Sequence, residues 1–361
     1  MKKLLFLFII FGLTGYCHLT GCRKENKVMK AYELRMQGKV DEALGMLNKI
    51  LQEDSTDAIA HYELARTLNY RMLGQGNNDM EGAIASIITS LDKAMKYDPG
   101  NVIYAYNKAM ANFMKAYLAM HKEEKKVKEY ISVTCNDFNN VLLLKPDYPE
   151  AVLYLVEIYG MLPPEMGGDS LKAIMYANKL AKMDDYFGAK AKLSLAGDKA
   201  DPVDFWTKYL SAHKSDANIQ KELGRACLYK DDPGQAAKYF NEAIKLDPSE
   251  NILLLDLARY HIMKVMQDKN LADKELPESK KFFEMYLASI PAPIIPLKAY
   301  TIGNLAKIAM FTGNQEEAEK QMKEAKALDP YFSRAFGIPS QVLFDRPDAV
   351  NHCFVSFFMP F

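Results

Sequence analysis

The feature that most constrains this chain is a pattern of small and large apolar residues that recurs at fixed distances. One copy consists of Leu223-Gly224, Ala236, Phe240, Ala243 and Pro248. A second complete copy consists of Leu305-Ala306, Ala318, Met322, Ala325 and Pro330. Small residues let two helices approach closely, and a proline cannot continue a helix. The pattern therefore predicts a tightly packed helical hairpin that closes at the proline and is repeated along the chain.

Partial copies set the period of the repeat. Leu257-Ala258 follows Leu223-Gly224 by 34 residues, and Leu64-Ala65 follows Lys30-Ala31 by the same distance. This spacing and the small residues resemble the tetratricopeptide repeat, whose period is about 34 residues. No segment shows a useful length of strand alternation. We therefore expect an all-α fold, and the resemblance implies a right-handed superhelical solenoid of about eight hairpins over residues 22–330.

Insertions interrupt the repeat at one kind of turn, between the first and second helix of a hairpin. They lie at 74–79, 121–128, 163–169 and 267–277. In a solenoid such loops emerge along one edge and often mark the binding side. Since loop length costs little free energy, turns also tolerate insertions that have no function. The pattern is weakest at 187–215, which we expect to form a degenerate hairpin.

The first 21 residues have the pattern of a signal peptide, with Lys2-Lys3 followed by an apolar run. The run is followed by Leu19-Thr20-Gly21-Cys22, which resembles the lipobox of bacterial lipoproteins. That resemblance implies cleavage before Cys22 and attachment of lipid to this cysteine, and Arg23 after it favours the outer membrane. A plain secretory signal with an incidental cysteine is the alternative. Periplasmic or surface exposure stays open.

Composition and motifs argue against several functional classes. The chain has 46 basic and 46 acidic residues, so it lacks the basic excess typical of nucleic-acid binding. It contains no phosphate-binding loop, no Gly-x-Ser-x-Gly and no paired-cysteine metal spacing, and His352-Cys353 is the nearest approach to a metal site. We therefore expect no enzymatic activity, no cofactor and no metal. The expected partner is an envelope protein or peptide.

A row of cations is the main candidate for a binding site. The residue that follows each Leu-small pair is a long cation in four hairpins: Arg66, Arg225, Arg259 and Lys307. In tetratricopeptide repeats this position faces the concave groove, so the resemblance implies a basic row that could bind carboxylates or phosphates. Tyr229 and Tyr300 would supply an aromatic part of the groove. The competing interpretations are a solvated or internally paired row and tyrosines buried between helices.

The turn at 163–169 contains the most distinctive local string, formed by Pro163, Pro164, Gly167, Gly168 and Asp169. The prolines stop one helix, the glycines permit positive φ, and Asp169 caps the next helix. The string resembles a turn of the lipid-anchored repeat proteins associated with TRAP-type solute transporters. That resemblance gives an alternative function, a solute-binding accessory lipoprotein whose anionic ligand is held by the basic row.

Residues 331–361 leave the repeat and end in a strongly apolar segment, 354–361. A solenoid normally ends in a cap with a polar outer face. We expect this segment to act as an apolar C-terminal cap or tail. It can lie on the last hairpin or enter the concave groove, and the sequence leaves both arrangements open.

Overall fold

The structure, a computed structural model, describes residues 27–75, 79–122, 125–213 and 215–335. The signal peptide, Cys22, residues 336–361 and His352-Cys353 lie outside the described residues. The expectations for them are therefore not tested by the structure.

The described residues form helices and turns and contain no strand. The first helix is described over residues 27–36 and is followed by α2 (Val40–Glu53). The next helices are α3 (Ala58–Gln75) and α4 (Met80–Tyr97), α5 (Val102–His121) and α6 (Val127–Leu144), and α7 (Pro149–Met161) and α8 (Ser170–Met183). They are followed by α9 (Asp185–Ala196) and α10 (Pro202–Ala212), α11 (Ala217–Tyr229) and α12 (Pro233–Leu246), α13 (Leu253–Gln267) and α14 (Ala272–Leu287), and α15 (Ile295–Phe311) and α16 (Gln315–Leu328).

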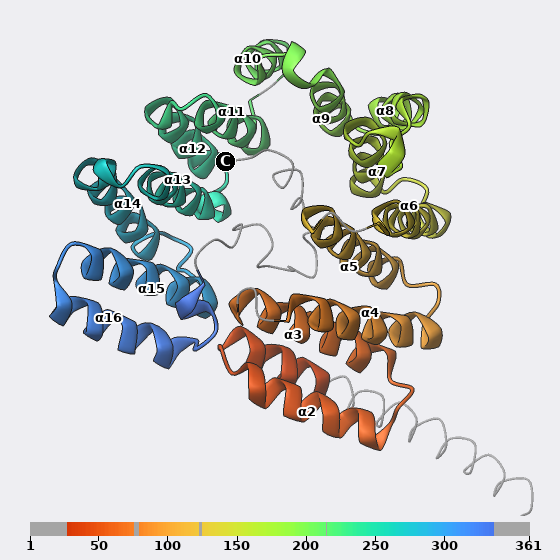
Figure 1. The fold of residues 1–361 in the computed structure, drawn as a ribbon, viewed down its shortest axis with the longest axis horizontal. Helices are drawn as coiled ribbons and strands as arrows, with labels where there is room; N and C mark the ends of the chain where they lie inside the picture. Colours follow the sequence, from red (N-terminus) through yellow and green to blue (C-terminus); the bar gives the residue numbers. More distant parts are fainter. Residues whose placement is uncertain (1–26, 76–78, 123–124, 214, 336–361) are drawn as a thin grey trace, which may run out of the picture.

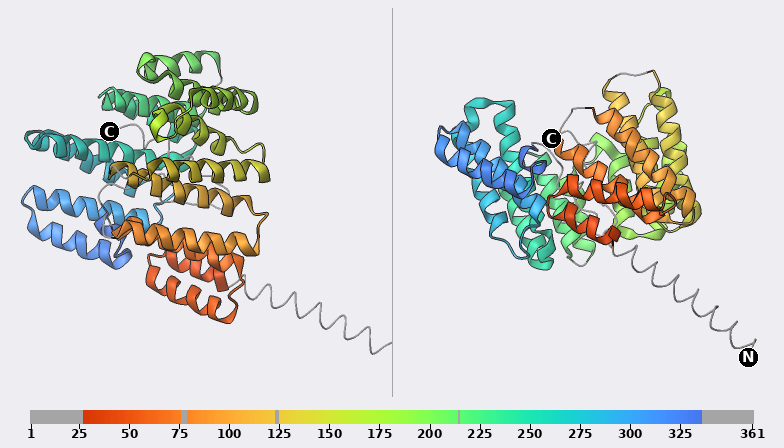
Figure 2. Two further views of the ribbon diagram at one scale, coloured as in Figure 1. Left: turned by 45° about the vertical axis from the view of Figure 1, so that its right-hand side comes forward. Right: turned by 90° about the horizontal axis from the view of Figure 1, so that it is seen from below.

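Short 3₁₀ turns join some of these helices: η1 (Pro164–Met166), η2 (Gly197–Lys199), η3 (Pro248–Ile252), η4 (Lys269–Leu271) and η5 (Phe332–Arg334). Successive helices pair as antiparallel hairpins, and the hairpins stack side by side (Figures 1 and 2). This arrangement confirms the all-α solenoid of about eight tetratricopeptide-like hairpins.

The repeated small residues let the two helices of a hairpin pack closely, as their spacing predicts. A Cβ at Gly224 of α11 would overlap the ring of Phe240 of α12. Phe240, Ala236 and Ala243 are all fully buried in the same hydrophobic cluster. The absence of a side chain at position 224 leaves room for the Phe240 ring beside the backbone of the first helix, so this contact sets how closely the two helices of the hairpin approach.

The two ends of the solenoid meet and close it into a ring (Figures 1 and 2). Tyr70 of α3 donates a hydrogen bond of 2.5 Å to Asp329, which follows α16. Tyr331 donates one of 2.7 Å to Asp41 of α2. The ring of Phe332 lies 4.3 Å from that of Tyr70, centroid to centroid. Residues 331–335, which the sequence assigns to the tail, therefore form part of this contact.

Two glycines permit this close contact, which we call the seam. Gly38, with φ of 76°, lies so close to the Leu328 carbonyl oxygen that a Cβ there would overlap it. A Cβ at Gly74 of α3 would stand 2.5 Å from the Cβ of Tyr331. Val40, Leu44 and Tyr70 belong to the same hydrophobic cluster as residues of α11 to α15 and Phe332 of η5. The seam therefore shares one core with the C-terminal half.

The structure corrects the insertion expected at 267–277. Helix α14 already begins at Ala272 and includes Pro277, so only the short η4 turn separates it from α13. A proline within a helix removes one backbone hydrogen bond. Burial of Leu276, Phe282 and Phe283 along the same helix offsets that loss.

The degenerate hairpin at 187–215 is present, but its two helices part. In the other hairpins the paired helices pack on each other, whereas α9 packs on α7 and α8, and α10 packs on α11. Trp206 of α10 is buried in a cluster with Ile219 and Leu223 of α11. Asp201, which caps α10, pairs with Lys230 at the end of α11, at 2.7 Å. Helix α10 thus belongs structurally to the next hairpin.

Candidate functional site

The first helix of each hairpin faces the middle of the ring, most plainly at α5, α7, α13 and α15 (Figure 1). The four cations of the predicted basic row lie on such helices: Arg66 on α3, Arg225 on α11, Arg259 on α13 and Lys307 on α15. The structure therefore places them in equivalent positions around the ring.

Three of these cations have an acidic partner one helical turn earlier. Arg66 pairs with Glu63 at 3.2 Å. Arg225 approaches Glu222 at 3.8 Å, and Arg259 approaches Asp256 at 3.6 Å. Residues three apart share one face of a helix, so each acid and cation lie side by side.

Further ion pairs join one hairpin to the next. Arg35 of the first helix binds Glu63 of α3 at 2.9 Å, and each of these side chains is only 4% exposed. Lys190 of α9 binds Glu222 of α11 at 3.1 Å. Arg225 of α11 also approaches Asp256 of α13, at 3.8 Å. Each acid thus bridges cations of two neighbouring hairpins.

The pKa values show how strongly these groups interact. Burial raises the pKa of the Glu222 carboxyl, but the charges of Lys190 and Arg225 and a hydrogen bond from Tyr186 outweigh burial and bring it to about 2. Burial lowers the pKa of Arg225, whereas Glu222 and Asp256 raise it and their effect is larger. Glu222 is therefore an anion that holds two cations at neutral pH.

Glu157 of α7 lies beside this network and behaves differently. Its residue is 2% exposed. Burial raises its pKa to about 7, because the attraction of Lys190 is weaker than the burial effect and Glu222 adds repulsion. A buried carboxylate without a close cation is costly to ionise. Glu157 thus changes its charge near neutral pH.

Lys307 has a different environment from the arginines of the row. The residue one turn before it is Asn304, and its Nζ donates to the carbonyl oxygens of Arg334, at 3.1 Å, and Ala335, at 2.9 Å. Burial lowers the pKa of this ammonium group to about 8. Lys307 therefore binds the end of η5 and the residue directly after it.

These contacts favour the internally paired interpretation of the basic row. Buried ion pairs of this kind fix the relative position of neighbouring elements, because removing one partner leaves an uncompensated charge. The three arginines of the row join hairpins through acids of the same chain. The sequence contains a signal for this pairing, an acid three residues before each of Arg66, Arg225 and Arg259, and internal pairing is one of the interpretations that the sequence leaves open.

The two tyrosines occupy unlike positions. Tyr300 of α15 is 1% exposed and lies in the large C-terminal hydrophobic cluster. This is a correction to its place in an open groove, since its ring packs against Phe283 of α14 with centroids 6.3 Å apart. Tyr229, at the end of α11, is 44% exposed and stays accessible to a partner.

The turn at 163–169 is a compact connection from α7 to α8. Pro163 and Pro164 follow the end of α7, and Asp169 caps α8 by accepting a hydrogen bond from the backbone of Lys172. Gly167 has φ of 107° and packs on Ile131 of α6. Gly168 has no positive φ, contrary to expectation; a Cβ there would overlap the Leu162 carbonyl oxygen.

The described residues form no metal site and no membrane-spanning helix. Among them, no group of three or more His, Cys, Asp or Glu side chains is arranged to hold a metal ion. None of the helices described is both long and apolar enough to span a bilayer. Cys135 and Cys227 are buried free thiols, and burial raises the pKa of both.

Comparisons with known proteins give likeness at the level of fold. No family model matches the chain, and no curated protein matches its sequence. A tetratricopeptide protein of Thermus thermophilus is 16% identical over 66% of this chain and 99% of its own, with a TM-score of 0.39. MamA is 19% identical over 61% and 95%, with a TM-score of 0.33. A tetratricopeptide repeat protein from Parabacteroides merdae is 14% identical over 84% and 93%, with a TM-score of 0.34. The chain's own stacked hairpins define it as a tetratricopeptide-like solenoid.

Proposed function

We propose that this chain is a non-enzymatic, lipid-anchored scaffold of the bacterial cell envelope that binds a protein or peptide partner. The observation that carries the proposal is the repeat architecture, which spreads side chains over long helical surfaces instead of gathering them in one cleft. Part of that surface is apolar. On the outer helix α8, Leu171, Ile174 and Met175 are 79%, 52% and 55% exposed. Contiguous exposed apolar residues are typical of interaction surfaces.

The anchor is proposed from the sequence Leu19-Thr20-Gly21-Cys22. Residues 23–26 alone separate Cys22 from the start of the described helix at Lys27. A lipid on Cys22 would therefore hold the first hairpin close to the membrane surface. Two or three acyl chains bind a bilayer firmly, since each buried methylene contributes about 0.8 kcal/mol.

Replacing Cys22 with alanine tests the anchor. Wild-type chain should sediment with the outer membrane and incorporate a palmitate analogue, and Cys22→Ala should lose the label and leave the membrane fraction. A labelled Cys22→Ala chain that still sediments with membranes would show that the anchor lies elsewhere.

Site-specific cross-linking tests the scaffold function. A photoreactive residue at Met175 on α8 should form an adduct with one envelope protein, and one at Lys323 on α16 serves as the surface control. Adducts at both positions with the same spread of abundant proteins would count against a specific partner.

The transporter alternative gains no support from the basic row. The arginines that would bind an anionic solute contact Glu63, Glu222 and Asp256 of the same chain. An anionic ligand would have to compete with these carboxylates for the arginines.

A further inference from the structure

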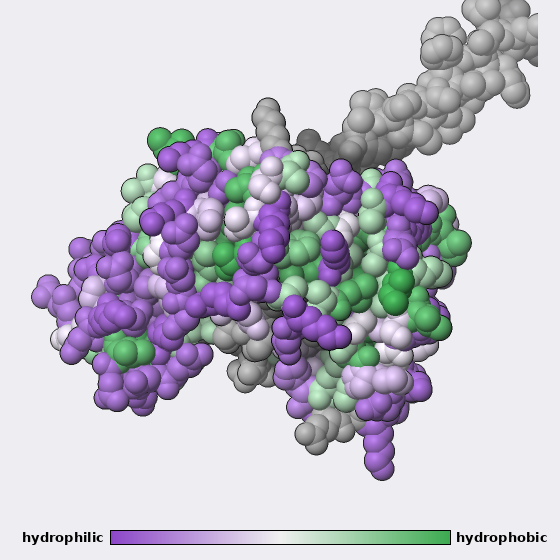
Figure 3. Space-filling view, turned by 90° about the horizontal axis from the view of Figure 1, so that it is seen from above, coloured by the Kyte–Doolittle hydropathy of each residue, from purple (hydrophilic) through white to green (hydrophobic). Residues whose placement is uncertain are grey.

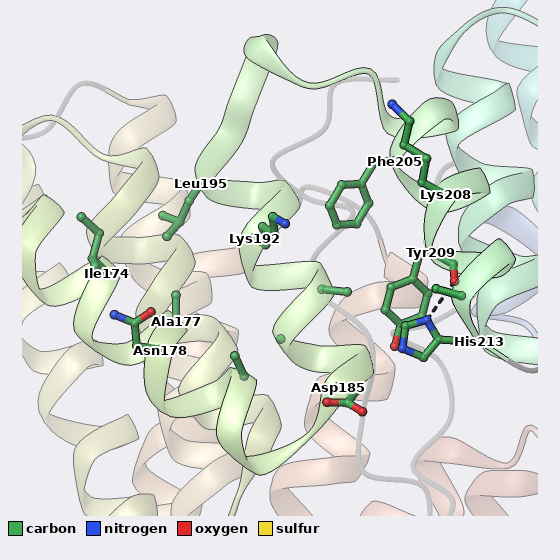
Figure 4. A pocket seen from close by; sticks show the side chains of 14 residues that line it. Ile174, Ala177, Asn178, Asp185, Lys192, Leu195, Phe205, Lys208, Tyr209 and His213 are labelled. Carbon is green, nitrogen blue, oxygen red and sulfur yellow. Dashed lines mark hydrogen bonds between the residues drawn. The ribbon is translucent and has the colours of Figure 1, made fainter.

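The parting of α9 and α10 leaves a groove on the outside of the ring. It is lined by α8, α9 and α10 and has a volume of about 700 Å³, within the range of roughly 300–1,000 Å³ that ligand pockets have. In Figure 4, Ile174 and Asn178 of α8 lie on one side, Phe205 and Tyr209 of α10 lie on the other, and Lys192 of α9 lies between. We call this hollow the α8–α10 groove.

The groove is long enough to hold a helix, and small residues at its base would let that helix approach closely. Its lining runs along α8 from Ile174 to Ala181, a rise of roughly 10 Å, and along α9 from Asp185 to Leu195, roughly 15 Å. Small residues form much of the floor: Ala177, Ala181, Gly188, Ala189 and Ala212. A floor of small residues lets another backbone approach closely, as within the hairpins of this chain.

The outer face of α8 continues the apolar lining. Leu171, Ile174 and Ala181 are three, then seven residues apart, a spacing that places them along one side of the helix. Figure 3, which looks onto the α10 side of the molecule, shows apolar colouring in the middle and on the right of this face, while its left lobe is mainly hydrophilic. The outer face of α16 contrasts with α8, since Glu316, Glu319, Lys320 and Lys323 are exposed there.

The charges of the groove define what can fill it. Lys192 is exposed and forms no ion pair with any part of the chain that the structure describes. Lys208 lies toward the same end but pairs with Asp204 of its own helix, at 2.6 Å. Asp185 lies at the other end, near His213 (Figure 4). Asp185 and Lys192 are seven residues apart, about two helical turns.

We infer that the α8–α10 groove binds the apolar face of an amphipathic helix from a partner protein, with a carboxylate of that helix opposite Lys192 and a cation about two turns away, opposite Asp185. The inference rests on the proposed scaffold function and names the class of partner; it is independent of the lipid anchor. The turn at 163–169 supports the site, because Asp169 caps α8 two residues before Leu171.

The test uses designed helical peptides and the purified full chain with Cys22→Ala, so that no lipid is attached. One fluorescent 18-residue peptide of Leu and Ala carries Glu and Lys two turns apart beside its apolar face; a second carries Lys at both places. Fluorescence anisotropy should show that the chain binds the Glu/Lys peptide about fivefold more tightly, the effect of one surface ion pair of about 1 kcal/mol.

Three variants locate the binding. Lys192→Glu should reverse the preference to the Lys/Lys peptide, whereas Lys182→Glu, the same charge change on α8 outside the lining, should keep the wild-type preference. Ala181→Arg, a long charged side chain at an exposed floor position, should abolish binding of both peptides. Circular dichroism melting verifies that each variant is folded.

Four outcomes would overturn the inference. Peptide binding that Ala181→Arg leaves intact would place the site elsewhere. Equal effects of Lys192→Glu and Lys182→Glu would show only general attraction. Self-association of the wild-type chain in sedimentation that Ala181→Arg abolishes, without peptide binding, would make the groove a contact between two copies. If no peptide binds but the photoreactive chain still cross-links to one envelope protein, the scaffold function stands and this inference fails.

Discussion

The Tyr70 hydroxyl donates a 2.5 Å hydrogen bond to the carboxylate of Asp329, 259 residues further along the chain. Asp329 is fully buried and also accepts hydrogen bonds from the backbone of Tyr331 and Phe332. One carboxylate therefore ties α3 to the end of α16 and orders η5 between them. Solenoid repeats contact mainly their sequence neighbours, so this pair makes the second and last hairpins neighbours as well.

Removing the Tyr70 hydroxyl should weaken the seam. Tyr70→Phe leaves a buried carboxylate oxygen without one donor, and we expect a loss of about 1–3 kcal/mol in the free energy of unfolding. Urea denaturation measures this loss, and small-angle X-ray scattering should show a larger radius of gyration if the ring opens. Tyr229→Phe, at an exposed tyrosine, is the control and should change neither quantity. Equal stability of Tyr70→Phe and wild type would show that the hydrogen bond does not hold the ends together.

Adding one methyl group should have opposite effects at two glycines of neighbouring helices. At Gly74 a Cβ would stand 2.5 Å from the Cβ of Tyr331, so Gly74→Ala should destabilise the chain by about 1–3 kcal/mol. At Gly45 of α2 no atom lies within 4 Å of such a Cβ. Gly45→Ala should therefore stabilise by up to about 1 kcal/mol through helix propensity. Thermal unfolding compares the two, and a stabilising Gly74→Ala would contradict the close seam.

The carboxylate of Glu222 should contribute more to the free energy of unfolding than a carboxylate in an exposed ion pair. Glu222→Gln leaves buried Lys190 and Arg225 with an uncharged partner, and we expect a loss of about 3 kcal/mol in chemical denaturation. Glu242→Gln breaks the exposed pair with Lys245 on α12 and should cost less than about 1 kcal/mol. Similar losses for both variants would show that the inner network contributes no more than a surface pair.

Glu157 should make stability depend on pH near neutrality. Its folded-state pKa of about 7 lies above its ordinary value of 4.5, so the folded chain binds more protons than the unfolded chain between these values. The free energy of unfolding should therefore fall as pH rises from 5 to 8, with a contribution from Glu157 of about 3 kcal/mol. The measurement is urea denaturation at several pH values.

Glu157→Gln isolates this contribution. The free energy of unfolding of this variant should fall much less than that of the wild type as pH rises. Glu129→Gln, at an exposed carboxylate on α6, should keep the wild-type pH dependence. A wild-type profile in Glu157→Gln would mean that this carboxyl does not ionise in the measured range.

Much of the fold follows from local sequence. The Leu-small pairs and the prolines place the hairpins, because the helices of one hairpin are close in sequence and their contact depends on a few small side chains. Gly224 under Phe240 is such a case. The inner positions of Arg66, Arg225 and Arg259 were predicted through the resemblance to the tetratricopeptide repeat, in which the residue after each Leu-small pair faces the concave groove.

The role of these arginines depends on contacts between different hairpins. The acid before each arginine is visible in the sequence, but the bridges from Arg35 to Glu63 and from Lys190 to Glu222 exist only after stacking. Pro277 was interpreted as the end of an insertion, although burial of its helix outweighs the lost hydrogen bond. The parting of α9 and α10 likewise depends on Trp206, which joins α10 to the following hairpin.

The sequence by itself thus determined the repeating unit, its all-α character and the row of inner cations, because these depend on contacts within about one repeat. Only the tertiary structure decided that the solenoid closes at Tyr70 and Asp329, that the row is paired, and that an apolar groove opens beside α8. All three depend on contacts between different hairpins, and the closure depends in addition on how small rotations between hairpins add up along the chain. No local pattern of residues encodes that sum.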